Sequence, residues 1–411
     1  MNLQNVRGMR DLIGLDARIQ EYLEDTFRKV FNKYGYQPLY TPAVENFDLF
    51  KVKGSAGDAI KEEIYYFKDK SGRELGLRFE LTASLARVVA TNQLKMPFRR
   101  YQIGEVYRYD RPQAKRYRAF TQADADILGI KGLNAELEIF LALKAFFDEI
   151  KLKPILKINS RKLLQAILEK YTNGKEMEAM RIIDKMDAFP KKEIKKMLQE
   201  KGINSDVIEL IERNSLEEIK KLVGEENEGL KEVNELLRMT KELGLNYTEF
   251  DSKLARGLEY YTGIVFEIKL DDGPSVLGGG RYDNLIGLYG GQETPAVGFG
   301  MGISRIIDYL KENNFRPRTK GLYLFGVGIN DKKLFEIAEQ FRKNGIAVEM
   351  DIGSKNLSKN IEYAQKKGYT FVGIIGENEL NTNKITIKNI GSGEQEQIGL
   401  NEISEIKKRI E

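Results

Sequence analysis

Two runs of alternating residues, separated by a polar segment, constrain the fold of this chain most strongly. Residues 101–109 and 117–126 each alternate in the manner of a β-strand. The stretch 111–115 between them is polar and contains Pro112. Because a polar, Pro-containing stretch between two strands is typical of a turn region, we expect a hairpin with a long loop. The pattern therefore predicts an antiparallel sheet in this part of the chain.

The second run divides its side chains unequally between the two faces of a strand. Residues two apart share a face, so one face carries Arg118, Phe120, Gln122, Asp124 and Asp126. The opposite face is mostly small, and its alanines would let another element pack closely behind the strand. The polar face can be a solvated edge or a ligand-binding surface, and the patterning alone leaves both open.

The same hairpin interleaves arginines with aromatic residues between positions 98 and 120. A guanidinium group binds a phosphate through paired hydrogen bonds, and a flat ring can stack on a base. The composition narrows the chemistry further, because the 411 residues include neither Cys nor His. A zinc enzyme or a Ser-His hydrolase is therefore excluded, whereas nucleotidyl transfer, which depends on positioning and electrostatics, fits.

Two features of the chain predict a cytoplasmic protein with no membrane association. No apolar run approaches the roughly 18 to 20 residues that a membrane-spanning helix needs. Residues 1–7 lack the apolar core of a secretory signal. The net charge of +4 only weakly favours a nucleic-acid partner.

Periodicity divides the chain into segments of different character. Helical spacing is expected over 14–36 and 133–150, and a Lys/Glu-rich helical module over 160–245. Gly-rich, strand-like sequence follows, and the last segment alternates strands and helices, which predicts a small α/β domain with a largely parallel sheet. We expect a catalytic domain in two parts around a helical insertion, then a C-terminal domain, with bounds 1–158, 159–247, 248–314 and 321–411.

The run from Arg108 to Gln122 resembles motif 2 of class II aminoacyl-tRNA synthetases. In that motif an Arg ends one strand, an acidic residue follows two positions on, and an Arg-x-x-x-Phe segment opens the next strand. Arg108, Asp110, Arg116 and Phe120 stand at these places. The resemblance implies an ATP site in which Arg108 holds the α-phosphate, Arg116 holds the β- and γ-phosphates and Phe120 stacks on adenine. The loop 111–115 would reach the acceptor end of tRNA.

Two further segments are similar to signatures of the histidyl-tRNA synthetases. Residues 256–263 read Arg-Gly-Leu-Glu-Tyr-Tyr-Thr-Gly, and residues 279–283 read Gly-Gly-Arg-Tyr-Asp. Arg256 before a glycine gives a cation on a tight turn that a ligand can approach. If a strand follows, Tyr260 and Tyr261 lie on its opposite faces, so only one of them would point into the pocket.

The resemblance also implies a histidine pocket. Residues 78–82 are similar to the Arg-x-Glu-x-Thr element of the family, although an edge-strand Glu80 beside a helix-capping Thr82 would give the same pattern. Many relatives carry Glu where this chain has Asp126, whose side chain is one methylene shorter, so either water bridges the ring contact or the strand is displaced towards the ring. The ammonium group would be bound by Glu80, Thr82 and Gln122, the imidazole by Asp126 and Tyr261, and the rest of the pocket would comprise Arg256, Tyr260 and Tyr282.

Three other regions extend the resemblance over nearly the whole chain. Residues 295–305 resemble motif 3, with Arg305 at the γ-phosphate, and residues 36–42 resemble motif 1, which implies a homodimer. The last domain, 321–411, resembles an anticodon-binding domain. By its position, the insertion would contact tRNA.

The family resemblance implies a fold and an activity. The expected fold is an α+β catalytic domain on an antiparallel sheet, with a helical insertion and a C-terminal α/β anticodon-binding domain. The expected reaction activates L-histidine with ATP and Mg²⁺ to histidyl-adenylate, with Arg108 and Arg256 as catalytic residues, and then charges tRNA(His). The alternatives are a synthetase-like regulatory subunit of ATP phosphoribosyltransferase, a synthetase for another amino acid, and a non-enzymatic RNA-binding module.

Overall fold

The computed structural model forms two compact units, Met1–Glu312 and Asn313–Glu411. No helix in the described part of the chain is long and apolar enough to cross a membrane. The structure describes residues 3–51, 61–109, 117–255, 260–271, 273, 275–353 and 356–410.

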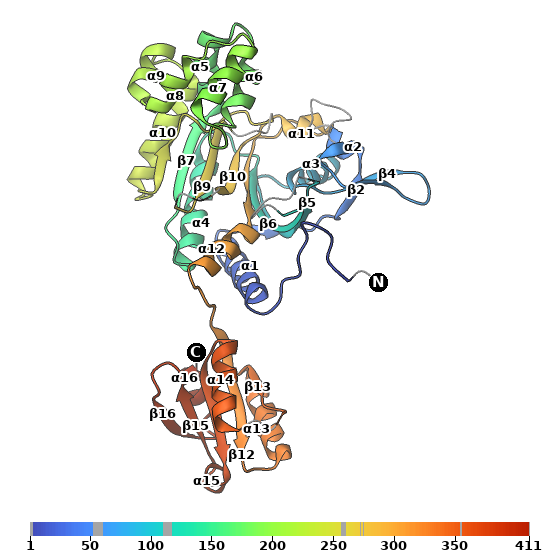
Figure 1. The fold of residues 1–411 in the computed structure, drawn as a ribbon, viewed down its shortest axis with the longest axis vertical. Helices are drawn as coiled ribbons and strands as arrows, with labels where there is room; N and C mark the ends of the chain where they lie inside the picture. Colours follow the sequence, from blue (N-terminus) through green and yellow to red (C-terminus); the bar gives the residue numbers. More distant parts are fainter. Residues whose placement is uncertain are drawn as a thin grey trace. The chain divides into compact units, whose positions relative to one another are not determined.

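A large sheet forms the centre of the first unit (Figure 1). All its neighbouring strands are antiparallel except the outermost pairs, β1–β5 and β7–β8, which are parallel. The predicted antiparallel sheet is thus confirmed. In spatial order the strands within the described residues are β1 (Gln37–Pro38), β5 (Phe98–Tyr107), β6 (Ala119–Leu128), β11 (Ala296–Gly302), β10 (Ser275–Arg281), β9 (Ile264–Lys269), β7 (Ile155–Ser160) and β8 (Thr248–Phe250).

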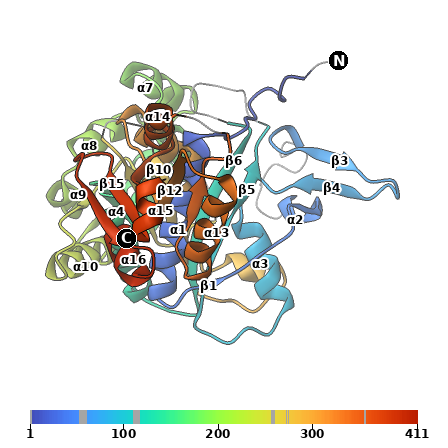
Figure 2. The same ribbon diagram turned by 90° about the horizontal axis from the view of Figure 1, so that it is seen from below.

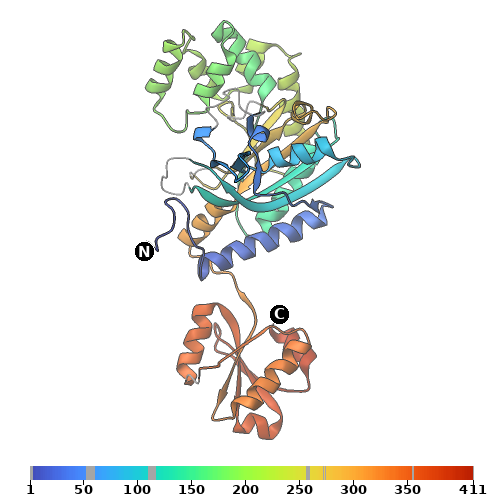
Figure 3. The same cartoon turned by 90° about the vertical axis from the view of Figure 1, so that its right-hand side faces the viewer.

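One face of this sheet is covered by helices α1 (Leu15–Lys33), α4 (Asn134–Glu149) and α12 (Ile303–Glu312), and Figure 3 shows α1 running along it. Helix α1 turns an apolar stripe towards the sheet because its apolar residues recur at helical spacing. Its Phe27 meets Tyr101 of β5 edge-to-face, with ring centroids 6.0 Å apart. Ala123 and Ala125 of β6 are completely buried on this side. The expectation that small residues allow close packing behind β6 is therefore confirmed.

The other face carries smaller elements that surround the functional site. A second sheet has the order β2–β4–β3, and in Figure 2 its β3–β4 hairpin projects away from the main sheet. Apolar residues of two helices, among them Leu85 and Leu285, pack together beside it. The elements are β2 (Val44–Asn46), β3 (Tyr66–Lys68), β4 (Glu74–Leu77), α2 (Asp48–Lys51), α3 (Thr82–Thr91) and α11 (Leu285–Leu288).

The predicted helical module lies between β7 and β8 (green and yellow-green in Figure 1). Helix α10 packs on α5 and on β7, which joins the module to the edge of the main sheet. The contact is close, because a Cβ atom at Gly229 would collide with the backbone of Leu163. The helices are α5 (Arg161–Thr172), α6 (Glu176–Ile183), α7 (Lys191–Glu200), α8 (Val207–Arg213), α9 (Leu216–Val223) and α10 (Glu228–Glu242).

The second unit is an α/β domain whose sheet is only half parallel. Its strand order is β13–β12–β14–β15–β16, in which the first two pairings are parallel and the last two antiparallel. The prediction of a largely parallel sheet is therefore wrong for the pairs β14–β15 and β15–β16, which are antiparallel. The strands are β12 (Thr319–Val327), β13 (Val348–Met350), β14 (Tyr369–Gly376), β15 (Lys384–Asn389) and β16 (Gln395–Gly399).

Apolar cores lie on both faces of this sheet because side chains alternate along the central strand β12. Leu322 and Leu324 face one core, which is closed by α13 and α16, while Tyr323 and Phe325 face the other, which is closed by α14. The helices are α13 (Asp331–Lys343), α14 (Leu357–Lys367), α15 (Glu377–Thr382) and α16 (Ile403–Ile410).

Candidate functional site

A cavity of about 390 Å³ opens on the polar face of the main sheet, opposite α1. Of the thirteen side chains that the sequence predicts for the site, three (Asp110, Arg116 and Arg256) lie outside the described residues. All the others line this one cavity, although they come from distant parts of the chain. They are Glu80, Thr82, Arg108, Phe120, Gln122, Asp126, Tyr260, Tyr261, Tyr282 and Arg305.

Strands β6 and β11 form the floor of the cavity, and the register between them decides which side chains are neighbours there. Gln122, Asp124 and Asp126 point up from β6, and the neighbouring strand β11 places a glycine beside each of them. A Cβ atom at Gly298 would collide with Asp126 Oδ1, and one at Gly300 would collide with Gln122 Nε2. The glycine-rich strand therefore leaves room for the polar side chains of β6.

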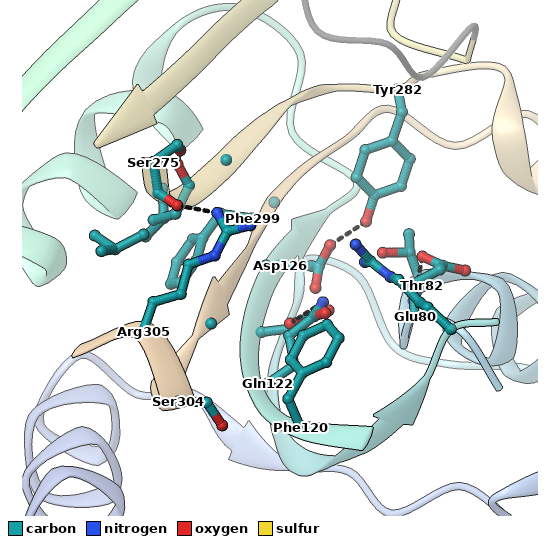
Figure 4. Close-up of a pocket in the computed structure, with 18 of the residues that line it drawn as sticks. Glu80, Thr82, Phe120, Gln122, Asp126, Ser275, Tyr282, Phe299, Ser304 and Arg305 are labelled. Carbon is teal, nitrogen blue, oxygen red and sulfur yellow. Dashed lines mark hydrogen bonds between the residues drawn. The ribbon is translucent and has the colours of Figure 1, made fainter. Parts of the chain in front are cut away.

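Asp126 is held from two sides. Its Oδ1 accepts a hydrogen bond from the Tyr282 hydroxyl (Figure 4), and its Oδ2 lies 2.6 Å from Arg100 Nη2. All three side chains are buried. Burial, followed by the negative charge of Asp126, raises the pKa of Tyr282 well above its ordinary value. Tyr282 therefore stays protonated and donates to a carboxylate that also has a cation beside it.

Gln122 and Asp124 form a second polar pair on the floor, and Gln122 Nε2 donates to Asp124 Oδ1 at 2.8 Å. This bond uses one of the two N–H donors of the Gln122 amide, whose oxygen is also a hydrogen-bond acceptor. Burial raises the pKa of Asp124 to about 8, with the Arg100 charge acting against the shift. Asp124 is thus mainly protonated at neutral pH, which limits the negative charge on the floor.

Glu80 lines the cavity, and its carboxylate also binds backbone N–H groups at the start of α3. Strand β4 ends at Leu77, so Glu80 lies in the turn that precedes α3 rather than on a strand. Its carboxylate accepts backbone hydrogen bonds from Thr82 at 2.9 Å and from Ala83 at 2.6 Å, which caps the helix. The alternative of an edge-strand Glu80 and a capping Thr82 is therefore wrong: Thr82 is the first residue of α3, after the N-cap Leu81, and the Glu80 carboxylate accepts from the first backbone N–H groups. Both residues line the cavity.

Tyr260 and Tyr261 both line the cavity, so the prediction that only one of them points into it is wrong. The two ring centroids are 4.9 Å apart, with the planes tilted by 48°. The alternation rule does not apply here because β9 begins only at Ile264. In the irregular segment before the strand, successive side chains can turn to the same side.

Two arginines line the described part of the cavity. In Figure 4, Arg305 lies across the cavity from Asp126 and Gln122, and its guanidinium donates to the carbonyl oxygen of Ser275. Arg108 Nε donates to the Phe79 carbonyl at 3.0 Å, and its guanidinium carbon lies 5.2 Å from the centroid of the Phe120 ring. The cavity therefore contains arginines and an aromatic ring as well as carboxylates.

Two titratable groups at or beside the site, Asp124 and Arg100, were not predicted from the sequence. The alternation along β6 already placed Asp124 on the same face as Asp126, so that signal was present. Arg100 belongs to the run of arginines and aromatic residues at 98–120, but that pattern indicated phosphate binding and did not place Arg100 against Asp126.

Tyr117 also lines the cavity without having been predicted. Its hydroxyl accepts a hydrogen bond from Arg10 at 2.7 Å and donates one to Asp308 at 2.9 Å. Burial and then Asp308 raise the pKa of Tyr117 to about 12, so its hydroxyl remains a donor. This contact ties the N-terminal segment to α12.

Comparison with known protein families matches both units of the chain. A family model described as histidyl-tRNA synthetase matches residues 8–306. A second model, described as an anticodon binding domain, matches residues 323–409. The first match covers more than half of the chain and includes every described site residue.

Individual relatives agree with these matches. The chain is 35% identical over 421 residues to the histidine–tRNA ligase of Sulfolobus acidocaldarius, covering 98% of this chain and 97% of the relative. A crystal structure of histidyl-tRNA synthetase from a Nostoc species superposes with a TM-score of 0.83 at 26% identity, over 100% of both chains. A Bacillus halodurans structure described as an ATP phosphoribosyltransferase regulatory subunit/histidyl-tRNA synthetase gives a TM-score of 0.74 at 22% identity, over 91% of this chain and 98% of that one. This last likeness concerns the fold alone.

Proposed function

Because this chain belongs to the histidyl-tRNA synthetase family, we propose that it is a histidine–tRNA ligase that works in two steps. It first activates L-histidine with ATP to histidyl-adenylate and pyrophosphate. It then transfers the histidyl group to the 3′ end of tRNA(His) and releases AMP.

The observation that carries this proposal is the chemistry of a single cavity. One set of side chains, Glu80, Gln122 and Asp126, offers carboxylate and amide oxygens, which suit an ammonium group and a ring N–H. The other set, with Arg108 and Arg305, suits phosphates. An amino acid and a nucleoside triphosphate bound to these two sets would bring a carboxylate and a phosphorus atom together between them.

The first step needs no general base. The histidine carboxylate is already ionised at neutral pH and attacks the α-phosphorus of ATP in line. A C–O–P bond forms, and the bond from the α-phosphorus to the bridging oxygen breaks as pyrophosphate leaves with its electron pair. Arg108 would orient the α-phosphate and balance its developing charge, and we assign the same role to Arg256. The absence of His from the sequence is compatible with this chemistry.

ATP is the nucleotide substrate, and Mg²⁺ would supply further charge neutralisation when bound to its phosphates. Among the described residues, no three carboxylates come together in a group that could hold a metal ion. The phosphates themselves would be oriented by Arg305 and, by resemblance, by Asp110 and Arg116, with Phe120 stacked on adenine.

The tRNA would contact the parts of the chain outside the cavity. We assign anticodon binding to the second unit, whose sequence matches an anticodon-binding model, and further tRNA contact to the helical insertion α5–α10. A homodimer, formed through the segment around Pro42, completes the proposal.

Amino-acid-dependent exchange between ATP and pyrophosphate tests the first step. All twenty amino acids are assayed on the purified protein, and we expect exchange with histidine alone. Arg108→Ala should lower exchange by at least about 100-fold, because it removes a charge that stabilises the transition state. Arg213→Ala is the matched control, since Arg213 lies in the insertion in a surface ion pair with Glu218. Aminoacylation of tRNA(His) then tests the second step.

Other results of the exchange assay would indicate one of the alternative functions. Exchange with a different amino acid would retain the class of enzyme and overturn the substrate. Folded protein that binds histidine without any exchange would favour a regulatory subunit of ATP phosphoribosyltransferase.

A further inference from the structure

Arg100 is a buried cation directly beside the cavity, and the family motifs assign it no role in the site. It lies in the middle of β5, and strand register places it opposite Asp126 of β6. Its side chain is 0% exposed, and its Nη2 lies 2.6 Å from Asp126 Oδ2. Asp126 lines the cavity and Arg100 does not. Arg100 can therefore act on a ligand only through its neighbours.

The position of Arg100 is unfavourable for the fold. None of its three guanidinium nitrogens makes a hydrogen bond to the described residues, and neither does Asp124 Oδ2. The approach of Nη2 to Asp126 Oδ2 at 2.6 Å is an ion pair without hydrogen-bond geometry. Burying a guanidinium with unsatisfied donors opposes folding, and a buried ion pair can often be replaced by apolar residues without loss of stability. Stability alone thus gives no reason for an arginine here.

The effect of Arg100 on Asp126 does give a reason. A cation in contact with a buried carboxyl group favours its ionised form, which has acceptors and no donor. The Tyr282 hydroxyl already donates to the other oxygen of the same carboxylate. Gly298 leaves the space that this carboxylate occupies. Asp126 is therefore both oriented and restricted to accepting hydrogen bonds.

We propose that Arg100 is a specificity-determining positioning residue, which keeps Asp126 ionised and aimed into the cavity so that it accepts a hydrogen bond from the imidazole N–H of histidine. This inference rests on the proposed function, because it takes histidine as the amino acid. A ring of similar size that lacks an N–H would cover the Asp126 carboxylate without donating to it. The cost of removing water from that carboxylate would then not be offset, so such a ring would be rejected.

The test compares two ligands on the full-length protein by titration calorimetry. Histidine offers a ring N–H, whereas β-(2-thienyl)alanine has a ring of similar size without one. We expect the wild-type protein to prefer histidine by at least about 1,000-fold. In Arg100→Met, Asp126 loses its cation and can take up a proton, so the preference should fall to below about 30-fold. Arg100→Lys keeps the charge and should retain most of the preference.

A double-mutant cycle shows whether Arg100 acts through Asp126. Asp126→Asn alone should weaken histidine binding by about 30- to 100-fold. Adding Arg100→Met to that variant should change the affinity by less than about threefold, because the carboxylate on which Arg100 acts is gone. If the losses simply multiply, Arg100 does not act through Asp126 and the proposal is overturned.

A structural role gives a different result. If Arg100→Met lowers the affinity for both ligands equally, the preference is unchanged and Arg100 supports only the fold. Thermal unfolding of each variant identifies global damage, and Arg100→Lys keeps the test decisive if Arg100→Met does not fold. Failure of the proposed function is separate, since wild-type protein would then not bind histidine at all.

Discussion

Arg281 of β10 and Glu136 of α4, 145 positions apart in sequence, form a buried two-point ion pair. Arg281 Nε lies 2.7 Å from Glu136 Oε1, and Arg281 Nη2 lies 2.6 Å from Glu136 Oε2. The same guanidinium reaches the carbonyl oxygens of Ile130 and Gly132. Within the Gly-Gly-Arg-Tyr-Asp segment, Arg281 thus joins the sheet to a helix, and the next residue, Tyr282, points into the cavity.

Breaking this pair should cost stability. We expect Arg281→Met to lower the free energy of unfolding by about 3 to 5 kcal/mol, because it leaves the buried Glu136 carboxylate without its cation. Glu136→Gln should cost less, because Arg281 keeps Asp283 Oδ1 at 3.2 Å. The combined variant should cost less than the sum of the two. Urea unfolding of the four proteins measures this, and Arg213→Met, in a surface pair, should change stability by less than about 1 kcal/mol. Additive losses would contradict the pairing.

The raised pKa of Asp124 predicts a pH-dependent stability. In the unfolded chain an Asp titrates near pH 3.9, whereas in the fold the pKa of Asp124 is about 8. Between these values the folded state binds a proton that the unfolded state does not, so the contribution of Asp124 to stability is lost as the pH rises from about 4 to about 8. The slope is about 1.4 kcal/mol per pH unit.

Asp124→Asn removes this titration. The difference in free energy of unfolding between the variant and the wild-type protein should therefore move in favour of the variant as the pH rises from 5 to 8. Urea unfolding at three pH values measures it. Parallel curves for the two proteins would show that Asp124 is ionised throughout.

Gly298→Ala should damage histidine binding without unfolding the protein. The added methyl group would collide with Asp126 Oδ1 and displace the carboxylate, so we expect at least about tenfold weaker binding of histidine by calorimetry. Gly287→Ala is the control, because its Cβ would lie 3.4 Å from the flexible side chain of Glu293. Unchanged affinity in Gly298→Ala would mean that Asp126 does not contact the amino acid.

The two adjacent tyrosines should both matter for binding. Tyr260→Phe and Tyr261→Phe should each weaken histidine binding by about 5- to 50-fold, because each removes a hydroxyl from a residue that lines the cavity. Tyr247→Phe is matched to them: its hydroxyl donates to the Phe140 carbonyl at 2.7 Å, away from the cavity. That variant should lose stability and keep its affinity. If only one of these two substitutions weakens histidine binding, only one of the two rings points into the pocket, as the sequence predicted.

The sequence predicts the hairpin well because alternation is a local property. The runs 101–109 and 117–126 correspond to β5 (Phe98–Tyr107) and β6 (Ala119–Leu128), with ends shifted by two or three residues. The polar face of β6 was also visible, since residues two apart share a face. Motif spacing then identified ten of the described residues that line the cavity.

What the sequence does not give is the pairing between strands. Arg100 lies outside the recognised motifs, and only the register of β5 on β6 places it against Asp126. The prediction for Tyr260 and Tyr261 was wrong for a related reason: the start of β9 decides where alternation begins. In the second unit, β15 follows the short helix α15 and β16 follows a turn, and their antiparallel pairing was not anticipated from the parallel units before them.

The glycines of β11 have a consequence for how the cavity can change. At Gly298 and Gly300 the backbone itself is the surface next to Asp126 and Gln122. A methyl group added at Gly298 would occupy space beside Asp126, and one added at Gly300 would occupy space beside Gln122. The depth of the cavity and the placement of the polar β6 side chains are therefore coupled, because a carbon added on β11 meets those side chains directly.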